Sequence, residues 1–477
     1  MAMPVSRTMI VPMIVASALF MENLDSTIIT TALPSMAESF ATTPIHLSVG
    51  ITAYVLSLAI FIPVSGWVAD RFGARTVFRS AIAVFTLGSV LCGFCNNVPE
   101  FAAARVLQGV GGAMMVPVGR LVMFRSVPRS EFVTAMAYLT VPALVGPILG
   151  PPVGGFITTY ASWRWIFFLN LPVGILGFFL VTSFIENYRE PESPSLDWVG
   201  FLLSGTSIAS LVYACDQVAR PDASASIPLA LFGLCLASGM AAAWHVRRHP
   251  HPVIDPSLLR IPTFSVSVLG GALFRVGTAS LNYLLPILLQ IGIGMTAFTS
   301  GLLTVAAAAG SFAMKIAAVA ILRRWGFRIV LVANGAISAV SVLVCAFFDV
   351  STPLEAIFVI LLVGGFFRSL QYTALNSIAF ADIAAPRMSA ATSFSSMVQQ
   401  ISNGMGVAFA AVVLNLVLVS RGDSLTEIPL GDIALTLVVM TAITLTSCLY
   451  FARLAPDAAA EVSGHRRLKA AADLNAE

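Results

Sequence analysis

Apolar runs of about 20 residues recur along almost the whole chain and are separated by short polar loops. A helix rises about 1.5 Å per residue, so about 20 apolar residues can cross the roughly 30 Å hydrocarbon core of a bilayer. The sequence therefore predicts an all-α polytopic membrane protein. We place fourteen spans, at residues 9–33, 47–68, 77–95, 97–121, 134–158, 165–185, 198–219, 226–245, 264–290, 297–321, 327–348, 353–378, 390–419 and 431–452.

Composition agrees with this fold class, because only 10% of the residues are charged and 58% are hydrophobic, whereas soluble domains carry about 25% charged residues. The first apolar run is too long for a cleaved signal peptide, so we expect it to be a retained span. Arginine occurs in loop clusters and not in a basic domain, which argues against a nucleic-acid partner. We expect membrane lipid and a small molecule as the partners.

Loop charge predicts the orientation of the chain. Nineteen of the 26 Lys and Arg residues fall on one side of the predicted topology and three on the other. Cytosolic loops carry the excess of Lys and Arg. The pattern places both termini in the cytosol and predicts a multi-pass protein of the inner (cytoplasmic) membrane.

A weak internal repeat suggests how the spans are grouped. Arg71-Phe-Gly-Ala-Arg75 follows span two, and Arg324-Trp-Gly-Phe-Arg328 follows span ten. Parallel repeats of this kind are typical of transporters. We predict a six-helix half at 1–190, an inserted helix pair with flanking loops at 191–262, a second six-helix half at 263–455, and a polar, disordered tail at 456–477.

Two carboxylates, Glu22 and Asp25, are the only acids that we assign to an apolar run. An acid in hydrocarbon costs roughly 2.5–3.5 kcal/mol or more and usually faces a cavity or a partner. The two are three residues apart and share a helix face. Arg105 in span four lies about as deep as Asp25, so we expect them to pair. Losing the pair would raise the pKa of the acid, which a proton carrier requires; a static pair that fixes two helices is the alternative.

The stretch from Gly66 to Arg75 closes span two and opens span three. Asp70 is placed to meet a helix N-terminus, Arg71 and Arg75 offer it alternative charge partners, and Gly66 and Gly73 allow a tight turn. Such a loop can hold a cytosolic gate in one state and release it in another. A merely solvated, positive-inside loop is the alternative.

Five motifs together resemble the major facilitator superfamily, and among its members the fourteen-helix drug:proton antiporters of the EmrB/QacA type. They are Gly66–Arg75; Leu24–Pro34 in the first span; Arg105-Val-Leu-Gln-Gly-Val-Gly-Gly in span four; Gly146-Pro-Ile-Leu-Gly-Pro-Pro-Val-Gly-Gly155 in span five; and Trp163–Gly174 at the start of span six. The second half looks closest to the subfamily D branch of multidrug transporters. Thr30 and Thr76 depart from the family pattern, which usually has Asn and a basic residue there, and the second basic loop has Arg323 where the first has Asp70.

The resemblance implies two six-helix halves plus two inserted helices, and proton-coupled efflux of drug-like compounds. It also implies that the span-five motif suppresses proton leak in an antiporter; simple helix packing is the alternative. The residues of that motif are Gly146, Pro147, Gly150, Gly154 and Gly155.

Polar stripes at helical spacing mark the second half. They comprise Arg275, Thr278 and Asn282 on span nine; Arg368, Gln371, Tyr372 and Asn376 on span twelve; and Ser393, Ser396, Gln400 and Asn403 on span thirteen. Polar faces on apolar spans most simply line a water-accessible cavity, and interhelical hydrogen bonding is the alternative. Arg275 and Arg368 have no acidic partner in this half, so we predict a preference for anionic or zwitterionic amphiphiles over cations.

No metal or cofactor is predicted. Cys92 and Cys95 stand alone at a helix end, and His245, His249 and His251 fall in a loop without an acid or Cys cluster nearby. We expect structural thiols and solvated imidazoles.

The chain is thus predicted to be a secondary active exporter that exchanges inward protons for small outward amphiphiles. It has no Walker loop for direct use of ATP. A metabolite exporter or an uptake carrier on the same fold is the nearest alternative. A membrane-embedded enzyme is a more distant one, because no nucleophile–base or metal constellation is found near the interface.

Overall fold

A computed structural model of the chain describes residues 7–42, 47, 49–190, 195–218, 226–250, 252–421 and 428–465. Each of the fourteen predicted spans overlaps a helical segment. Among the described residues, ten helices are long and apolar enough to cross a membrane, and one of them, Thr299–Cys345, contains two of the predicted spans. The all-helical, multi-pass architecture is confirmed, and the count of fourteen stays a prediction.

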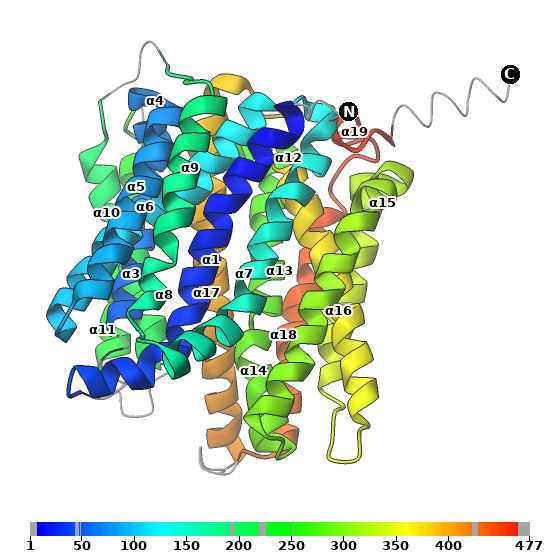
Figure 1. Cartoon of the computed structure of the whole chain (residues 1–477). Helices are drawn as coiled ribbons and strands as arrows, with labels where there is room; N and C mark the ends of the chain where they lie inside the picture. The colour runs from blue at the N-terminus through cyan, green and yellow to red at the C-terminus, as the bar shows by residue number, and fades with distance from the viewer. Residues whose placement is uncertain are drawn as a thin grey trace, which may run out of the picture.

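The N-terminal part of the chain forms one bundle, on the left in Figure 1. Its helices are α1 (Arg7–Ser39), α3 (Val49–Phe61) continued through η1 (Ile62–Val64) into α4 (Ser65–Phe72), α5 (Ala74–Phe94), α6 (Val98–Ser126), α7 (Phe132–Tyr160), α8 (Trp165–Phe168) and α9 (Asn170–Phe184). Helix α1 packs against α6, α7 and α9, and α5 packs against α6. A helix near the middle of the first bundle therefore carries both predicted carboxylates.

The C-terminal part forms a second bundle beside the first. It consists of α12 (Pro262–Ser265), η4 (Val266–Gly270), α13 (Gly271–Ala279), α14 (Leu281–Ile287), η5 (Leu288–Gly292), α15 (Ala297–Cys345), α16 (Leu354–Ile378), α17 (Met388–Arg421) and α18 (Leu430–Phe451). The two bundles meet where α17 packs against α6 and where α15 and α16 pack against α7.

Between them in sequence come α10 (Trp198–Val218) and α11 (Ser226–Val246), which pack against each other. Helix α10 also contacts α3 of the first bundle and α17 of the second. These helices are the predicted inserted pair, and α10 touches both bundles.

The internal repeat has a structural counterpart in two glycines. Gly73, between α4 and α5, has φ 92°. Gly326 has φ 71° and breaks α15 into two arms that correspond to predicted spans ten and eleven. Because a residue with a Cβ atom rarely adopts such angles, glycine at the same place in both basic motifs makes the same sharp turn possible.

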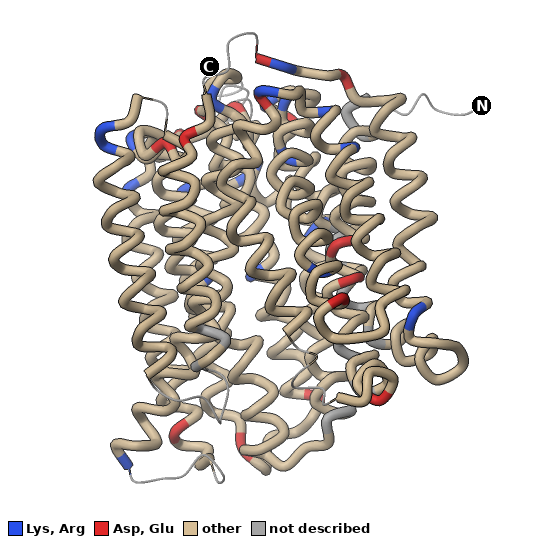
Figure 2. Tube along the Cα trace, turned by 90° about the vertical axis from the view of Figure 1, so that its left-hand side faces the viewer, with Lys and Arg blue, Asp and Glu red and all other residues tan. Residues whose placement is uncertain are grey.

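Figure 2 shows that Lys and Arg gather at one end of the molecule, which we call the basic end. It is the end at which α4 finishes and α12 begins (Figure 1).

The C-terminal segment differs in part from the prediction: residues 460–463 of the expected disordered tail form α19, and Val462 is buried. Residues 466–477 lie outside the described part of the chain.

Four acids that the sequence reasoning did not count lie within predicted spans, each in the first or last turn of a helix: Glu100, Asp216, Glu355 and Asp432. Asp432 is fully buried and forms an ion pair with Arg421 at 2.7 Å. All four were missed because they stand at the margins of apolar runs, where hydropathy defines a span least sharply.

Candidate functional site

Asp25 is enclosed by three helices of the first bundle. Its carboxylate and the guanidinium of Arg105 on α6 are each only 1% exposed. Arg105 Nη1 donates to Asp25 Oδ2 at 2.7 Å, while Gln108 Nε2 and Asn170 Nδ2 each donate to Oδ1 at 2.9 Å. The structure thus places the predicted pair in contact and adds two neutral donors to the same carboxylate.

Arg105 is itself held from several sides. Its Nη1 donates to Gln108 Oε1 at 2.6 Å, its Nε donates to the carbonyl of Gly50 at 3.4 Å, and its guanidinium lies 4.3 Å from the centre of the Tyr54 ring. The network therefore joins α1, α3, α6 and α9. A buried polar network of this kind is stabilising only while its members stay satisfied.

Glu22 is placed differently from Asp25, although they share a face of α1. The Tyr54 hydroxyl donates to Glu22 Oε1 at 3.5 Å. The other oxygen, Oε2, is buried and has no hydrogen-bond partner among the described residues. Glu22 thus retains an acceptor that a substrate, a water molecule or a proton could use.

Arg120 lies near Glu22 and was misassigned by the sequence pattern, which counted it among the cytosolic loop residues. It lies inside α6 and interacts electrostatically with both Glu22 and Arg275 of the second bundle. Its Nη2 donates to Gln399 Oε1 of α17 at 3.2 Å, while Nε and Nη1 have no hydrogen-bond partner in the described part of the chain. Arg120 therefore brings cationic donors to the contact between the bundles.

The span-five motif packs α7 against the Glu22–Asp25 segment of α1. A Cβ atom on Gly146 would lie 2.9 Å from the backbone nitrogen of Leu24, and one on Gly150 would collide with the Thr27 side chain. Close approach of the two helices therefore requires glycine at both positions. Gly154 is buried, Gly155 has open space beside it, and the side chain of Pro147 lies outside the described residues.

Asp70 joins the two bundles at the basic end. Ser389 Oγ, in the first turn of α17, donates to Asp70 Oδ2. Arg125 of α6 lies 3.6 Å from Asp70 Oδ1 and 3.1 Å from Glu190. Asp70 does meet a helix N-terminus, but the arginine that approaches it is Arg125, and neither Arg71 nor Arg75.

The other members of the predicted gate loop have separate places. Arg71 is exposed, and Arg75 donates to the carbonyl of Ile185 at 3.5 Å. Gly66 permits close approach of α4 to α17, because a Cβ atom there would lie 2.7 Å from Ser389 O. The loop thus contacts the second bundle directly at the basic end.

In the second bundle, Arg275 is 4% exposed and donates to Asn376 Oδ1 at 3.2 Å. Its guanidinium lies 5.6 Å from the centre of the Tyr372 ring, whose hydroxyl is 2.8 Å from Thr278 Oγ1. The predicted stripes on spans nine and twelve therefore face each other. No carboxylate pairs with Arg275 among the described residues.

Of the other residues predicted to line the cavity, one packs between two helices and the others are half-buried or exposed. Gln371 is fully buried and bonds to Asn334 Nδ2 and to the carbonyl of Leu331 in α15, so it packs α16 against α15 and does not line a cavity. Gln400 is half-buried, and Asn282 and Asn403 are exposed. Arg368 is half-buried and interacts electrostatically with Tyr372.

Sequence reasoning missed several functional candidates. Gln108 and Asn170 stood inside quoted motifs, but spacing alone does not reveal that separate helices bring them to one carboxylate. Arg120 was missed because it stands at the end of an apolar span, where it resembles a loop cation. Its position on one helical face with Arg105, about four turns earlier, was the available signal.

Comparisons with known proteins agree with this architecture. The sequence profile of the family described as the Major Facilitator Superfamily matches residues 15–407. The protein named "Putative multidrug resistance protein MdtD" of Pectobacterium atrosepticum is 39% identical over 411 residues, which cover 84% of this chain and 86% of that protein.

Two solved structures share the fold. The human organic anion transporter MFSD10 (TETRAN) superposes with a TM-score of 0.66 at 14% identity, over 94% of this chain and 100% of its own. The proton:xylose symporter XylE, bound to 6-bromo-6-deoxy-D-glucose, gives 0.63 at 14% identity, over 97% and 98%. At this identity the likeness concerns the fold alone.

Proposed function

The chain belongs to the major facilitator superfamily, and from this premise we propose that it is a proton-coupled multidrug exporter of the inner membrane. It would move small amphiphilic compounds outward in exchange for protons, with both termini in the cytosol. The 39% identity to a multidrug resistance protein over 84% of the chain supports efflux of drug-like compounds. A transporter of this family needs no catalytic residues.

The observation that carries the proposal is the bonding of Asp25. Asp25 lies on α1, and its carboxylate accepts hydrogen bonds from residues of α6 and α9. Protonation would remove the charge that Arg105 compensates and would weaken the contact between α1 and α6. The protonation state of one group is thereby linked to helix packing, which is the coupling that an antiporter requires.

Glu22 extends this proposal toward the substrate. It lies one turn from Asp25 and also interacts with Arg120, which is bonded to Gln399 of the second bundle. A bound substrate at the contact between the bundles would therefore change the surroundings of Glu22 before those of Asp25. We assign Asp25 to proton coupling and Glu22 to tuning that coupling or contacting substrate.

The cations at this contact bear on substrate charge. Arg120 interacts electrostatically with Arg275 and with the carboxylate of Glu22, while Arg275 has no carboxylate partner among the described residues. An anionic or zwitterionic ligand would relieve the cost of two buried guanidiniums. We propose that the exporter prefers such amphiphiles over lipophilic cations.

Gating is assigned to the contacts of Asp70 with Ser389 and Arg125 at the basic end. These contacts must separate before a substrate can enter from the cytosol. Each proton that moves inward through a 100 mV potential supplies about 2.3 kcal/mol toward the cycle.

Proteoliposome transport tests the coupling. We expect Asp25→Asn to abolish substrate-dependent proton flux, read with an internal pH dye, because Asn keeps the size of the side chain and does not titrate. Asp349→Asn is the matched control, since Asp349 is exposed and bonds only to Ser351 and Thr352 among the described residues. Full pH-dependent transport by Asp25→Asn would exclude Asp25 as the coupling group.

A further inference from the structure

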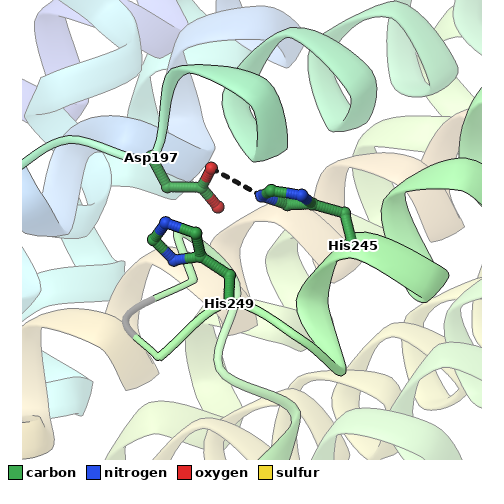
Figure 3. A group of neighbouring side chains, drawn as sticks. All are labelled: Asp197, His245 and His249. Carbon is green, nitrogen blue, oxygen red and sulfur yellow. Dashed lines mark hydrogen bonds and ion pairs between the residues drawn. The ribbon is translucent and has the colours of Figure 1, made fainter.

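Three metal-ligating side chains converge at the basic ends of the inserted helices (Figure 3). In the sequence, His245 and His249 lie in a loop that has no cluster of acids or cysteines near it. The structure supplies an acid, Asp197, from the other inserted helix, 48 residues before His245. Reachable ligand atoms of the three residues all lie within 4.8 Å of one another.

Asp197 is held in place with one oxygen unused. It precedes α10 and caps its first turn, because Gly200 N donates to Asp197 Oδ1 at 2.8 Å. Asp197 Oδ2 is buried and has no hydrogen-bond partner in the described part of the chain, and the residue is 4% exposed. The Gly200 N–H and His245 Nε2 thus hold one carboxylate oxygen in place, and the other oxygen has no partner among the described residues.

His245 lies in the last turn of α11, and His249 follows shortly after the end of that helix. His249 N donates to the carbonyl of His245 at 3.0 Å, which continues the helical turn past Val246. Their ring centres are 5.2 Å apart and the ring planes differ by 32°. Histidines at i and i+4 of a helical turn are a spacing that binds zinc. Figure 3 shows both rings directed toward Asp197.

An ordinary ion pair explains only part of this arrangement. His245 Nε2 lies 2.8 Å from Asp197 Oδ1, and that contact with the helix cap would suffice for a structural role. It does not use Asp197 Oδ2, and His249, which also interacts electrostatically with Asp197, lies beside the same carboxylate. Two imidazoles and a carboxylate are a donor set that Zn²⁺ accepts, with ligand distances of about 2.0–2.2 Å.

The surroundings favour a cation and leave room for a fourth ligand. Asp197 and His249 line a cavity of about 640 Å³ whose wall also carries Asp70, Glu190 and Asp255, with Arg387 as its one lysine or arginine among the described residues. Arg387 forms an ion pair with Asp255 at 2.8 Å. Water from this cavity could complete a tetrahedral site.

We propose that Asp197, His245 and His249 bind a divalent transition metal of the zinc class, with Asp197 contributing Oδ2. The ligand atoms now lie up to 4.8 Å apart, so they must move closer together by about 1 Å or more to bind one metal ion. Rotation of the two imidazole rings supplies this movement. The metal ties the start of α10 to the end of α11. The site is separate from Asp25, so its test does not depend on the transport proposal.

Zinc titration of the full chain tests the site. The protein is purified with a tag that contains no histidine, stripped with a chelator, and titrated with ZnCl₂ against a chromophoric zinc chelator. We expect one Zn²⁺ per chain. We expect the affinity to fall by roughly tenfold or more in His249→Gln and in His245→Gln, because loss of a ligand costs at least as much as loss of its supporting partner. His465→Gln is the matched control: His465 lies on the C-terminal segment and contacts Arg323 O at 3.1 Å.

Two further readouts separate metal binding from misfolding. Co²⁺ in wild type should give the strong visible absorption of a four-coordinate site, and this absorption should vanish in His249→Gln. Zn²⁺ should raise the Tm of wild type and of His465→Gln while leaving that of His249→Gln unchanged, with the metal-free Tm values equal. Equal zinc affinity in wild type and His249→Gln, or a Co²⁺ spectrum like that of the ion in buffer, would overturn the site.

Discussion

Removing both charges of the Asp25–Arg105 pair should destabilise the protein by clearly less than the sum of the two single removals. In Asp25→Asn the guanidinium of Arg105 stays 1% exposed and loses its only ion-pair partner among the described residues. In Arg105→Gln the carboxylate keeps two neutral donors, Gln108 and Asn170, but no cation. The double variant leaves only amides and carbonyls, which can hydrogen bond to one another.

The expected loss of stability in each variant can be estimated from the distance between the two charges. At 2.7 Å the attraction between the two charges is about 6 kcal/mol for an effective dielectric constant of about 20. Desolvation offsets much of it, and breaking a buried pair costs about 3–5 kcal/mol. We therefore expect each single substitution to lower the free energy of unfolding by about 3–5 kcal/mol, with a coupling energy of about 3 kcal/mol between them.

A double-mutant cycle measures this coupling. Free energies of unfolding would be taken from reversible denaturation in mixed micelles, followed by circular dichroism. Asp255 and Arg387 provide the control pair: their ion pair has nearly the same length, 2.8 Å, but the side chains are 30% and 38% exposed. That pair should couple by about 0.2–1 kcal/mol. A coupling for Asp25 and Arg105 no larger than that of the control would refute the argument.

Two further predictions concern gating and substrate. Asp70→Asn should slow turnover more than it weakens substrate binding, because Asp70 contacts Ser389 and Arg125 at the basic end and does not lie at the Glu22–Arg120 contact; a proportional loss of affinity, measured by tryptophan quenching, would contradict the gate. Arg275→Gln should reduce efflux of an anionic dye by several-fold and spare a cationic dye of equal hydrophobicity, with the exposed Arg260→Gln as control. Strong cation efflux that is unaffected by Arg275→Gln would exclude the anion preference.

How far sequence predicts this molecule depends on the kind of contact. The helices follow from apolar run length alone, and equal depth in two spans was enough to predict that Asp25 meets Arg105. The repeat of Gly73 and Gly326 was visible as a pair of basic motifs, and the structure adds the positive φ that both share. These features depend on local sequence or on helix rise, which are fixed before any packing is known.

Contacts that depend on rotation of one helix about its axis were not predictable. Gln371 shares a stripe with Arg368 and Tyr372, but it points into α15 and bonds to Asn334. Arg125 replaced Arg71 and Arg75 as the partner of Asp70, because tertiary packing brings the end of α6 beside α4. The acid that completes the histidine cluster, Asp197, came from a separate helix for the same reason. Spacing defines a face, whereas packing decides what that face meets.

The inserted helices can be given a role from where they lie. Helix α10 contacts α3 of the first bundle and α17 of the second. The cavity beside Asp197 is lined by Asp70 and Ser389, the two residues that join the bundles at the basic end. Opening the gate would move Ser389 away from Asp70 and so change the wall against which α10 and α11 are held. If a metal ties the start of α10 to the end of α11, the two helices form a more rigid wall beside the Asp70–Ser389 contact, and the gate becomes harder to open. The inserted helices are then part of the gate's support, as well as additional membrane spans.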